Sequence, residues 1–208
     1  MSSIKSKFSI ESNLNSSILL VSKSPRRVQL LTQAGYQFEP FSLETSEIID
    51  ENLNCFDQCK RLACIKMEHF KDEIGLRYGD FKFALTCDTM VEFKGESLGK
   101  PESLHRAKKW LLDYSGKSQF VHTACCLLRL DGSGQDKSWV ETTKINFKEV
   151  SESGVDEYLK NNTEVLGKAG GYGIQDETFS LVKEIEGSYT NVVGLPMESL
   201  KRELESWG

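Results

Sequence analysis

The chain has 208 residues, of which 38% are hydrophobic and 10% aromatic, so it is long enough to bury a substantial core. Its 26 Lys and Arg residues against 31 Asp and Glu residues give a formal net charge of −5, which argues against non-specific nucleic-acid binding. No apolar run approaches the roughly 18–20 residues that span a bilayer, so we expect a cytoplasmic protein that does not bind membranes. Residues 1–16 are polar and Ser-rich, and they are predicted to form a disordered lead to a single domain over residues 17–208.

The first ordered unit is predicted to be a strand, a helix and a second strand. Residues 17–22 form a short apolar run, which is typical of a buried strand. Ser24 is a favoured helix N-cap residue, Pro25 occupies the favoured first helical position, and Gly35 is typical of a helix end. Residues 37–43 have the character of a second strand.

A long helix and an alternating strand are expected next. The helix is predicted over residues 53–74, where apolar residues recur at spacings of three and four and form one stripe. The strand is predicted over residues 81–88, where apolar and polar side chains alternate, and we expect Asp88 to end it. The apolar stripe of the helix consists of Phe56, Cys59, Leu62, Ala63, Met67 and Phe70.

The second half of the chain again mixes helices and strands. A Gly-containing turn over residues 131–136 separates two strand-like runs, so these runs are expected to pair as a hairpin. Helices are expected over residues 103–114, 155–160 and 197–207, and strands over residues 120–130, 139–147 and 179–185. The mixture predicts an α/β or α+β fold.

The six cysteines form no Cys-X-X-Cys pair and have no spacing typical of a zinc knuckle. Cys125 and Cys126 are adjacent, so they are expected to point to opposite faces of a strand. We expect the cysteines to be buried and reduced, and a redox or metal-binding role is the alternative.

The turn from the first strand into the first helix has an unusual charge pattern. Arg26 and Arg27 stand in the first helical turn, where their positive charge opposes the helix dipole at a cost of ~0.3–1 kcal/mol each. The backbone N–H groups of a helix N-terminus attract anions, and the two guanidinium groups and the Ser24 hydroxyl add to that attraction. The pattern favours a phosphate site, with a solvated basic turn or a Ser-Pro phosphorylation site as alternatives.

Two further charged residues accompany the apolar patterns. Lys66 lies at the edge of the apolar stripe of the long helix, from which a lysine extends to water or enters a cleft. Asp88 follows an apolar strand pattern, in which Asp has a poor propensity. A carboxylate there, followed by Thr89, suits a metal ligand or a general base, and a structural turn is the alternative.

Two loops complete the set of candidate residues. Lys100 is presented by the tight turn of residues 98–101, and residues 167–175 are rich in glycine, which permits close approach of the backbone to a ligand. The chain has no P-loop sequence. Cations and carboxylates beside a Gly-rich loop are the composition of a metal-dependent phosphate-ester site, and the charged candidates are Arg26, Arg27, Lys66, Lys100, Glu47 and Asp88.

Five segments, in the same order, resemble those of the Maf family. Together they cover nearly the whole chain, from about residue 18 to about residue 205. They are Leu20-Val-Ser-Lys-Ser-Pro-Arg-Arg27; Glu47; Leu62-Ala-Cys-Ile-Lys66; Cys87-Asp-Thr-Met-Val91 with Leu98-Gly-Lys-Pro101; and Lys168-Ala-Gly-Gly-Tyr-Gly-Ile-Gln175 with Gly187-Ser-Tyr-Thr-Asn-Val-Val-Gly-Leu-Pro196.

The resemblance implies a nucleoside triphosphate pyrophosphatase, which cleaves its substrate to the monophosphate and pyrophosphate and depends on a divalent metal, Mg²⁺ or Mn²⁺. It also implies two α/β lobes around a long mixed β-sheet with the nucleotide in the cleft, a fold similar to that of the inosine triphosphate pyrophosphatases. Members of the family are commonly dimeric, so a homodimer is expected.

The resemblance also implies roles for individual residues. Asp88 matches the catalytic proton acceptor, and Asp88 and Glu47 match carboxylates linked to the metal or to the attacking water. Lys66 matches a position that takes part in catalysis by binding phosphate. The residues that match phosphate-binding positions are Arg26, Arg27, Lys66 and Lys100, with the Ser24 hydroxyl beside them.

Three positions separate the two specificities of the family. The branch that prefers dTTP, UTP and modified pyrimidine triphosphates has Arg, Thr and Gln there, which match Arg26, Thr89 and Gln175. The branch that prefers 7-methyl-GTP tends to have Trp, Gln and an acidic residue. The resemblance thus favours dTTP and UTP, with 7-methyl-GTP or an inosine-type purine triphosphate as the alternative substrate. A non-catalytic, nucleotide-binding regulator of cell division is the alternative function.

Overall fold

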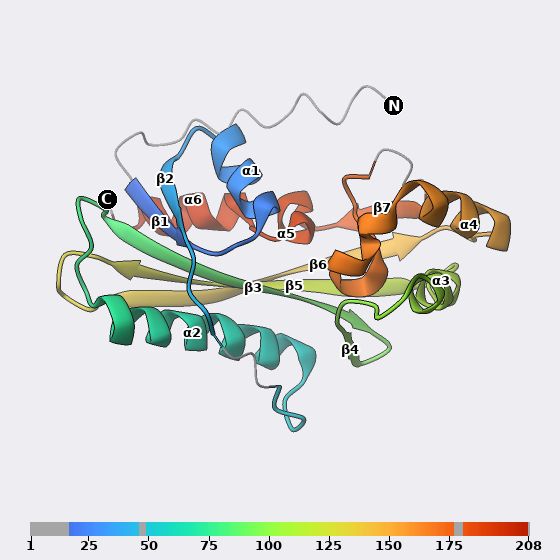
Figure 1. Cartoon of the computed structure of the whole chain (residues 1–208), viewed down its shortest axis with the longest axis horizontal. Helices are drawn as coiled ribbons and strands as arrows, with labels where there is room; N and C mark the ends of the chain where they lie inside the picture. Colours follow the sequence, from blue (N-terminus) through green and yellow to red (C-terminus); the bar gives the residue numbers. More distant parts are fainter. Residues whose placement is uncertain (1–16, 46–48, 177–180, 208) are drawn as a thin grey trace.

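The computed structural model of the chain describes residues 17–45, 49–176 and 181–207, which fold around one mixed β-sheet (Figure 1). Its strands are β1 (Ser17–Val21), β2 (Gln37–Phe41), β3 (Phe83–Phe93), β4 (Glu96–Leu98), β5 (Ser118–Arg129), β6 (Asp136–Phe147) and β7 (Val182–Glu186). The strand order is β2-β1-β3-β5-β6-β7, and β4 pairs with β3 outside this path. The three strands β1, β2 and β3 are parallel, and the remaining pairs are antiparallel. The expected mixed α/β architecture is confirmed.

The helices cover the sheet as two lobes on the long strands β3, β5 and β6 (Figure 1). They are α1 (Pro25–Gln33), α2 (Cys55–Ile74), α3 (Leu104–Asp113), α4 (Glu152–Asn161), α5 (Tyr189–Val193) and α6 (Met197–Glu205), with short 3-10 turns η1 (Thr163–Gly167) and η2 (Ala169–Gly171). One lobe has α2 on one face of the sheet and α1 and α6 on the other, and the second lobe contains α3 and α4 (Figure 1). Within the described residues, none of these helices combines the length and apolar character needed to cross a bilayer.

Side-chain alternation along the strands divides the core into three clusters. Leu85 of β3 packs with residues of α1 and α6, whereas its neighbour Ala84 packs with residues of α2. Val91, further along the same strand, contributes to the core of the second lobe. Cys125 and Cys126 are likewise split between the two faces, as expected for adjacent strand residues. The same long strands therefore hold both lobes in register.

Local sequence signals account for most element boundaries. The predicted N-cap residue Ser103 accepts a hydrogen bond from the Arg106 N–H group, at 3.2 Å. The last helix is confirmed as α6, and the predicted hairpin is confirmed by the antiparallel pairing of β5 with β6. Predicted strand 179–185 is observed as β7 from Val182 onward, and its first two residues lie outside the described ranges, as does the predicted lead over residues 1–16.

The prediction that Asp88 ends its strand is wrong. Strand β3 continues for five residues beyond Asp88, to Phe93, because β5 pairs with it throughout and places Ala124 opposite Asp88. Tertiary pairing thus overrides the poor strand propensity of Asp. The short elements β4 and α5 were not predicted either, since neither has a periodic pattern long enough to recognise.

One edge of β3 has two different neighbours with an interval between them. β1 pairs with β3 as far as Thr86, and β4 begins its pairing at Val91. Residues 87–90 therefore lie between the two neighbouring strands on that edge, while β5 occupies the other edge. The interval lies just beyond the carboxyl ends of the parallel strands, the region where open α/β sheets bind ligands.

Replacing Leu85 by Ala should lower the free energy of unfolding by ~2–5 kcal/mol, because its side chain is 0% exposed in the central strand. Leu104→Ala is the matched control, since Leu104 is 39% exposed and its loss should change stability by about 0.5 kcal/mol or less. Urea denaturation of both variants measures the difference. Equal losses would show that the cluster around Leu85 is not the main core of its lobe.

Candidate active site

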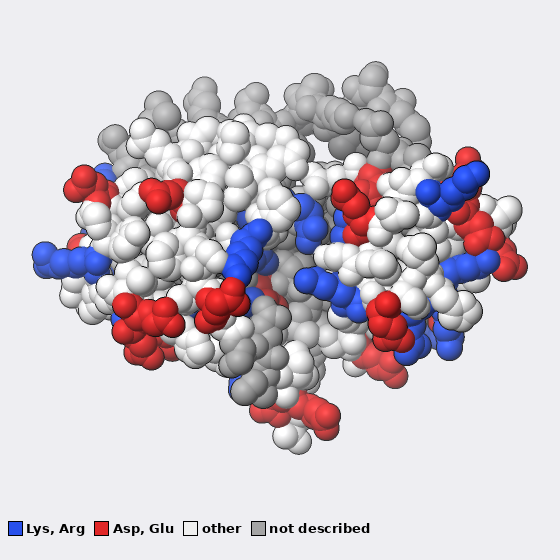
Figure 2. Space-filling model, viewed as in Figure 1, with Lys and Arg blue, Asp and Glu red and all other residues white. Residues whose placement is uncertain are grey.

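A cavity of about 720 Å³ opens at the interval between β1 and β4. It is lined by the end of β1, the N-terminus of α1, the middle of β3, the turn after β4 and the Gly-rich segment 167–176. Basic side chains gather around a hollow near the middle of the molecule in Figure 2. A cavity of this size between two lobes is large enough for a nucleotide-sized ligand.

The structure brings together eight of the nine residues that the sequence singled out. Glu47 is the exception, because it lies outside the described ranges; Thr45 and Ile49 on either side of it line the cavity. The eight residues come from the N-cap and first turn of α1, from α2 and β3, from the turn after β4 and from the Gly-rich segment. They are Ser24, Arg26, Arg27, Lys66, Asp88, Thr89, Lys100 and Gln175.

Asp88 and Lys66 form a close ion pair in the wall of the cavity. The Lys66 Nζ atom lies 2.5 Å from the Asp88 Oδ1 atom. Asp88 is only 8% exposed, and Lys66 reaches it from the α2 helix across the face of the sheet. The Lys66 ammonium group thus holds the Asp88 carboxylate in a fixed orientation in the cavity wall.

The Cys59 thiol supports the backbone below this pair. Its sulfur donates to the Asp88 carbonyl oxygen at 3.4 Å and to the His122 carbonyl oxygen at 3.3 Å. Burial, followed by the negative charge of Asp88, raises the pKa of Cys59 to about 12, so this group stays a thiol at neutral pH. The expectation of buried, reduced cysteines holds for five of the six, since Cys64 is half-buried and none is in a disulfide.

Arg27 lines the cavity, but most of its N–H groups form hydrogen bonds with other residues of the protein. Its Nε atom donates to the Gly194 carbonyl oxygen at 2.8 Å. Its Nη1 atom donates to Ser22 Oγ at 2.9 Å and to the Cys87 carbonyl oxygen at 3.0 Å, and its Nη2 atom donates to Thr89 Oγ1 at 3.2 Å. Four of the five N–H groups of the guanidinium are thus engaged. Arg27 ties α1 to β3 and to the residue after α5.

Arg26 differs from Arg27 although the two stand in the same helical turn. Arg26 is half-buried and lines the cavity, and no hydrogen bond from its guanidinium to a described residue is found. Burial lowers the pKa of Arg26, repulsion from Arg27 lowers it further, and the charge of Asp176 opposes both effects. An anion in the cavity would relieve this concentration of positive charge.

The N-terminus of α1 adds backbone donors to the same wall. The Ser24 side chain makes no capping hydrogen bond, and no acidic residue stands in the first turn. Among the described residues, no side chain caps the first N–H groups of the helix. Backbone N–H groups at a helix N-terminus attract anions, so this wall suits a negatively charged ligand.

The Gly-rich segment is anchored to the turn that carries Lys100. The Gly170 N–H group donates to the Gly99 carbonyl oxygen at 3.0 Å, and the Tyr114 hydroxyl donates to the Gly170 carbonyl oxygen at 2.9 Å. Gly170 has a φ of +74°, and a Cβ atom there would lie 3.2 Å from a Val91 methyl group. Only glycine allows this close approach, which holds the Gly-rich segment beside the turn that carries Lys100.

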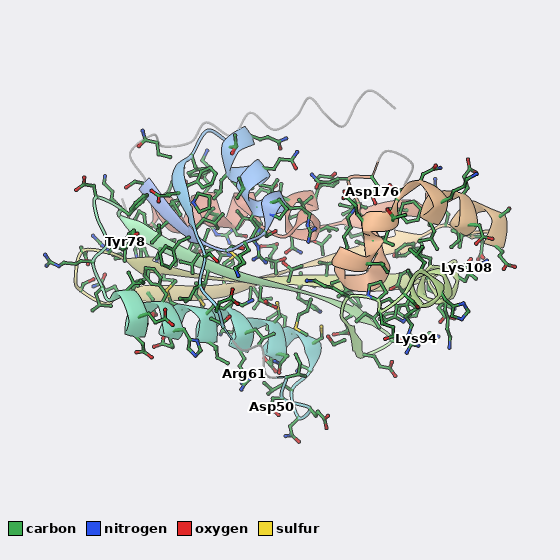
Figure 3. The ribbon with its side chains drawn as sticks, in the orientation of Figure 1. Asp50, Arg61, Tyr78, Lys94, Lys108 and Asp176 are labelled. Carbon is green, nitrogen blue, oxygen red and sulfur yellow. The ribbon has the colours of Figure 1, made fainter. Side chains whose placement is uncertain are left out.

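An ion pair that the sequence reasoning missed lies in the same wall. Lys168 Nζ lies 2.7 Å from Asp176 Oδ1, and the Tyr158 hydroxyl donates to Asp176 Oδ2 at 2.6 Å. Burial raises the pKa of Tyr158, and its hydrogen bond with Asp176 adds to the shift. Asp176 lies in the lobe that contains α3 and α4 (Figure 3). Opposite charges flanking a Gly-rich run were the available signal, but sequence spacing cannot show that they meet.

The oxygen donors of the cavity fit a hard divalent cation. Asp88 supplies one fixed carboxylate, and the phosphate oxygens of a nucleotide would supply others. The lysine and arginine side chains around it suit the negative charge that such a cation leaves uncompensated.

Comparison with known proteins identifies the family. The family model described as "Maf-like protein" matches residues 17–207. A dTTP/UTP pyrophosphatase from Bdellovibrio bacteriovorus is 36% identical over 91% of this chain and 98% of its own length, and one from Carboxydothermus hydrogenoformans is 37% identical over 92% and 98%. A solved nucleoside-triphosphatase/dITP/XTP pyrophosphatase from Mycobacterium abscessus matches with a TM-score of 0.40 and 13% identity, over 63% of this chain and 74% of that one. The match over nearly the whole length and the identity to these relatives show that the chain belongs to the Maf family.

Proposed function

We propose that the chain hydrolyses dTTP and UTP to the nucleoside monophosphate and pyrophosphate, acting as a cytoplasmic homodimer. The observation that carries this proposal is the convergence of Asp88 with Arg26, Lys66 and Lys100 on one cavity. These residues are far apart in the sequence, and they meet in a member of a family whose similar relatives are named dTTP/UTP pyrophosphatases.

The triphosphate binds along the basic wall of the cavity. Arg26 and the first N–H groups of α1 contact one part of the phosphate chain, with the Ser24 hydroxyl beside them. Lys66 and Lys100 approach from α2 and from the turn after β4. Arg27 contributes its charge and one remaining N–H group, while its other donors hold the wall in place. Charges on three sides neutralise the negative charge that builds up as pyrophosphate leaves.

Asp88 acts as the base. It accepts a proton from a water molecule, which attacks the α-phosphorus as the bond from that phosphorus to the bridging oxygen of pyrophosphate breaks. Lys66 holds the carboxylate in its orientation. Asp88 and Glu47 would hold a divalent cation, which would polarise the phosphate oxygens and offset their charge.

The pyrimidine ring of the nucleotide binds at the outer part of the cavity. Gln175 is exposed and lines the cavity, so its amide offers both a donor and an acceptor to a pyrimidine. Thr89 accepts a hydrogen bond from Arg27, and its hydroxyl lies 3.0 Å from the Thr123 hydroxyl. Thr89 therefore contributes to specificity by positioning Arg27 and the floor of the cavity.

Asp88→Asn should lower kcat for dTTP by roughly 10²- to 10⁴-fold, because an amide cannot accept the proton of the water. The measurement is pyrophosphate release with Mg²⁺ or Mn²⁺, with the fold checked by circular dichroism. Asp72→Asn, an exposed position on α2 outside the cavity, is the matched control and should keep its activity. Unchanged turnover in Asp88→Asn would remove Asp88 from the role of base.

The two adjacent arginines should fail in different ways. Arg27→Met should lower the free energy of unfolding by ~2 kcal/mol or more, because it leaves buried oxygen atoms of Cys87 and Gly194 without their donor. Arg26→Met should leave stability unchanged and raise KM for dTTP by ~10-fold or more. Urea denaturation measures stability, and initial-rate kinetics measure KM. A loss of stability in Arg26→Met, with only a raised KM in Arg27→Met, would contradict these assignments.

A panel of dTTP, UTP, CTP, dATP, GTP, ITP and 7-methyl-GTP should show preferential hydrolysis of dTTP and UTP. Gln175→Glu should lower kcat/KM for dTTP by ~10-fold, because a carboxylate cannot donate a hydrogen bond to the pyrimidine ring. A wild-type preference for 7-methyl-GTP would keep the enzyme but contradict the interpretation of the three specificity positions. Binding of nucleotides without any hydrolysis would instead support a regulator.

A further inference from the structure

A thiol, a carboxylate and an imidazole meet beside the cavity, on residues that the proposed reaction does not use. Cys55 is the first residue of α2, Glu92 lies near the end of β3, and His122 lies in β5. The potential ligand atoms of the three side chains all lie within 4.8 Å of one another. In the β3–β5 register His122 stands opposite Met90, so Glu92 is its diagonal neighbour on the same face, below the first turn of α2.

The His122 ring is held with one nitrogen directed at the other two groups. Its Nδ1 atom lies 2.9 Å from the Thr142 hydroxyl, and the rings of Phe56 and Phe120 lie edge-on and stacked against it, at 5.8 and 6.4 Å. Its Nε2 atom is buried, makes no hydrogen bond to a described residue, and lies 3.5 Å from Glu92 Oε2. The side chain is only 7% exposed. Glu92 thus lies close to this nitrogen without a well-formed hydrogen bond, and the two atoms face a position that a cation could share.

These three donors have the chemistry of a zinc site. Zn²⁺ is bound by thiolate, imidazole and carboxylate, usually in a tetrahedral arrangement. Bond lengths of about 2.0–2.3 Å place tetrahedral ligands roughly 3.5 Å apart, so side-chain movements of about 1 Å would bring the three groups into coordination. A metal-binding histidine usually forms a hydrogen bond through the ring nitrogen that does not bind the metal, and this bond fixes the orientation of the ring. The contact of His122 Nδ1 with the Thr142 hydroxyl has this role here.

We propose that Cys55, Glu92 and His122 form a binding site for a borderline-soft divalent cation such as Zn²⁺. It is distinct from the oxygen-rich position at Asp88. Binding replaces the proton of the Cys55 thiol, which passes to solvent, and leaves one coordination position for water. Ser97, which interacts with Cys55, lines the cavity, so the site lies beside the cavity wall.

A cation at this site would connect the elements that position Asp88. A cation at this position joins the N-terminus of α2 to β3 and β5, the strands that set the position of Asp88. The same helix carries Lys66, the partner of Asp88. Metal binding therefore stabilises the wall that orients the proposed base, and it does not require turnover to be detected.

The test is a titration of the metal-free, reduced full-length chain with Co²⁺, which substitutes for Zn²⁺ and gives a thiolate-to-metal charge-transfer absorption. We expect this absorption to saturate at one equivalent and to disappear on addition of Zn²⁺. Cys55→Ser should abolish it, whereas Cys64→Ser, a half-buried thiol on the same helix outside the cluster, should retain it. Thr142→Val should weaken binding by ~10- to 100-fold.

Several outcomes would overturn the proposal. These are the absence of a charge-transfer absorption, and an absorption that is lost in Cys64→Ser but kept in Cys55→Ser. Glu92→Gln keeps the shape of its side chain and the thiol, so unchanged Co²⁺ affinity in this variant would also contradict the site, even if Cys55→Ser does not fold. Asp88→Asn separates the two sites, because it should lose hydrolysis while retaining the absorption.

Discussion

The position of the cavity follows from the interval in strand pairing along one edge of β3. β1 stops at Val21 and turns into α1, while β4 joins the same edge only at Val91. Between them, the backbone of β3 presents Asp88 to one face of the sheet and Thr89 to the other, and both residues line one cavity. β5 pairs with this part of β3 on the other edge, so the backbone of β3 stays hydrogen-bonded there. A rigid strand with an open edge thus places a carboxylate where a ligand can reach it.

Arg27 connects the segments that surround that interval. Its guanidinium joins the end of β1 through Ser22, β3 through Cys87 and Thr89, and the residue after α5 through Gly194. A positive charge in the first helical turn is unfavourable by itself, and these acceptors offset it. Arg26, one residue earlier, is left to face the cavity. The unfavourable charge pattern in the sequence therefore has a structural cause at Arg27 and, under the proposed function, a phosphate-binding cause at Arg26.

Much of the fold was predictable because its signals are local. Ser103 caps its helix, Pro25 begins the first one, and the alternation of β5 and β6 about a Gly-containing turn gives the hairpin. The continuation of β3 past Asp88 was not predictable, because pairing with β5 decides it. The candidate site residues were named from the charge pattern and the resemblance. The sequence did not show that Arg27 would bond to the protein while Arg26 faces the cavity. Asp176 and the cluster of Cys55 with His122 depend on contacts between distant segments, which no single stretch of sequence reveals.

In the proposed reaction a water molecule in this cavity attacks the α-phosphorus of a pyrimidine triphosphate. The site of attack can be measured by hydrolysing dTTP in ¹⁸O-labelled water and analysing both products by mass spectrometry. We expect the label to enter the nucleoside monophosphate and the pyrophosphate to remain unlabelled. Label in the pyrophosphate would place the attack on the β-phosphorus, and the position assigned to Asp88 in the reaction would then be wrong.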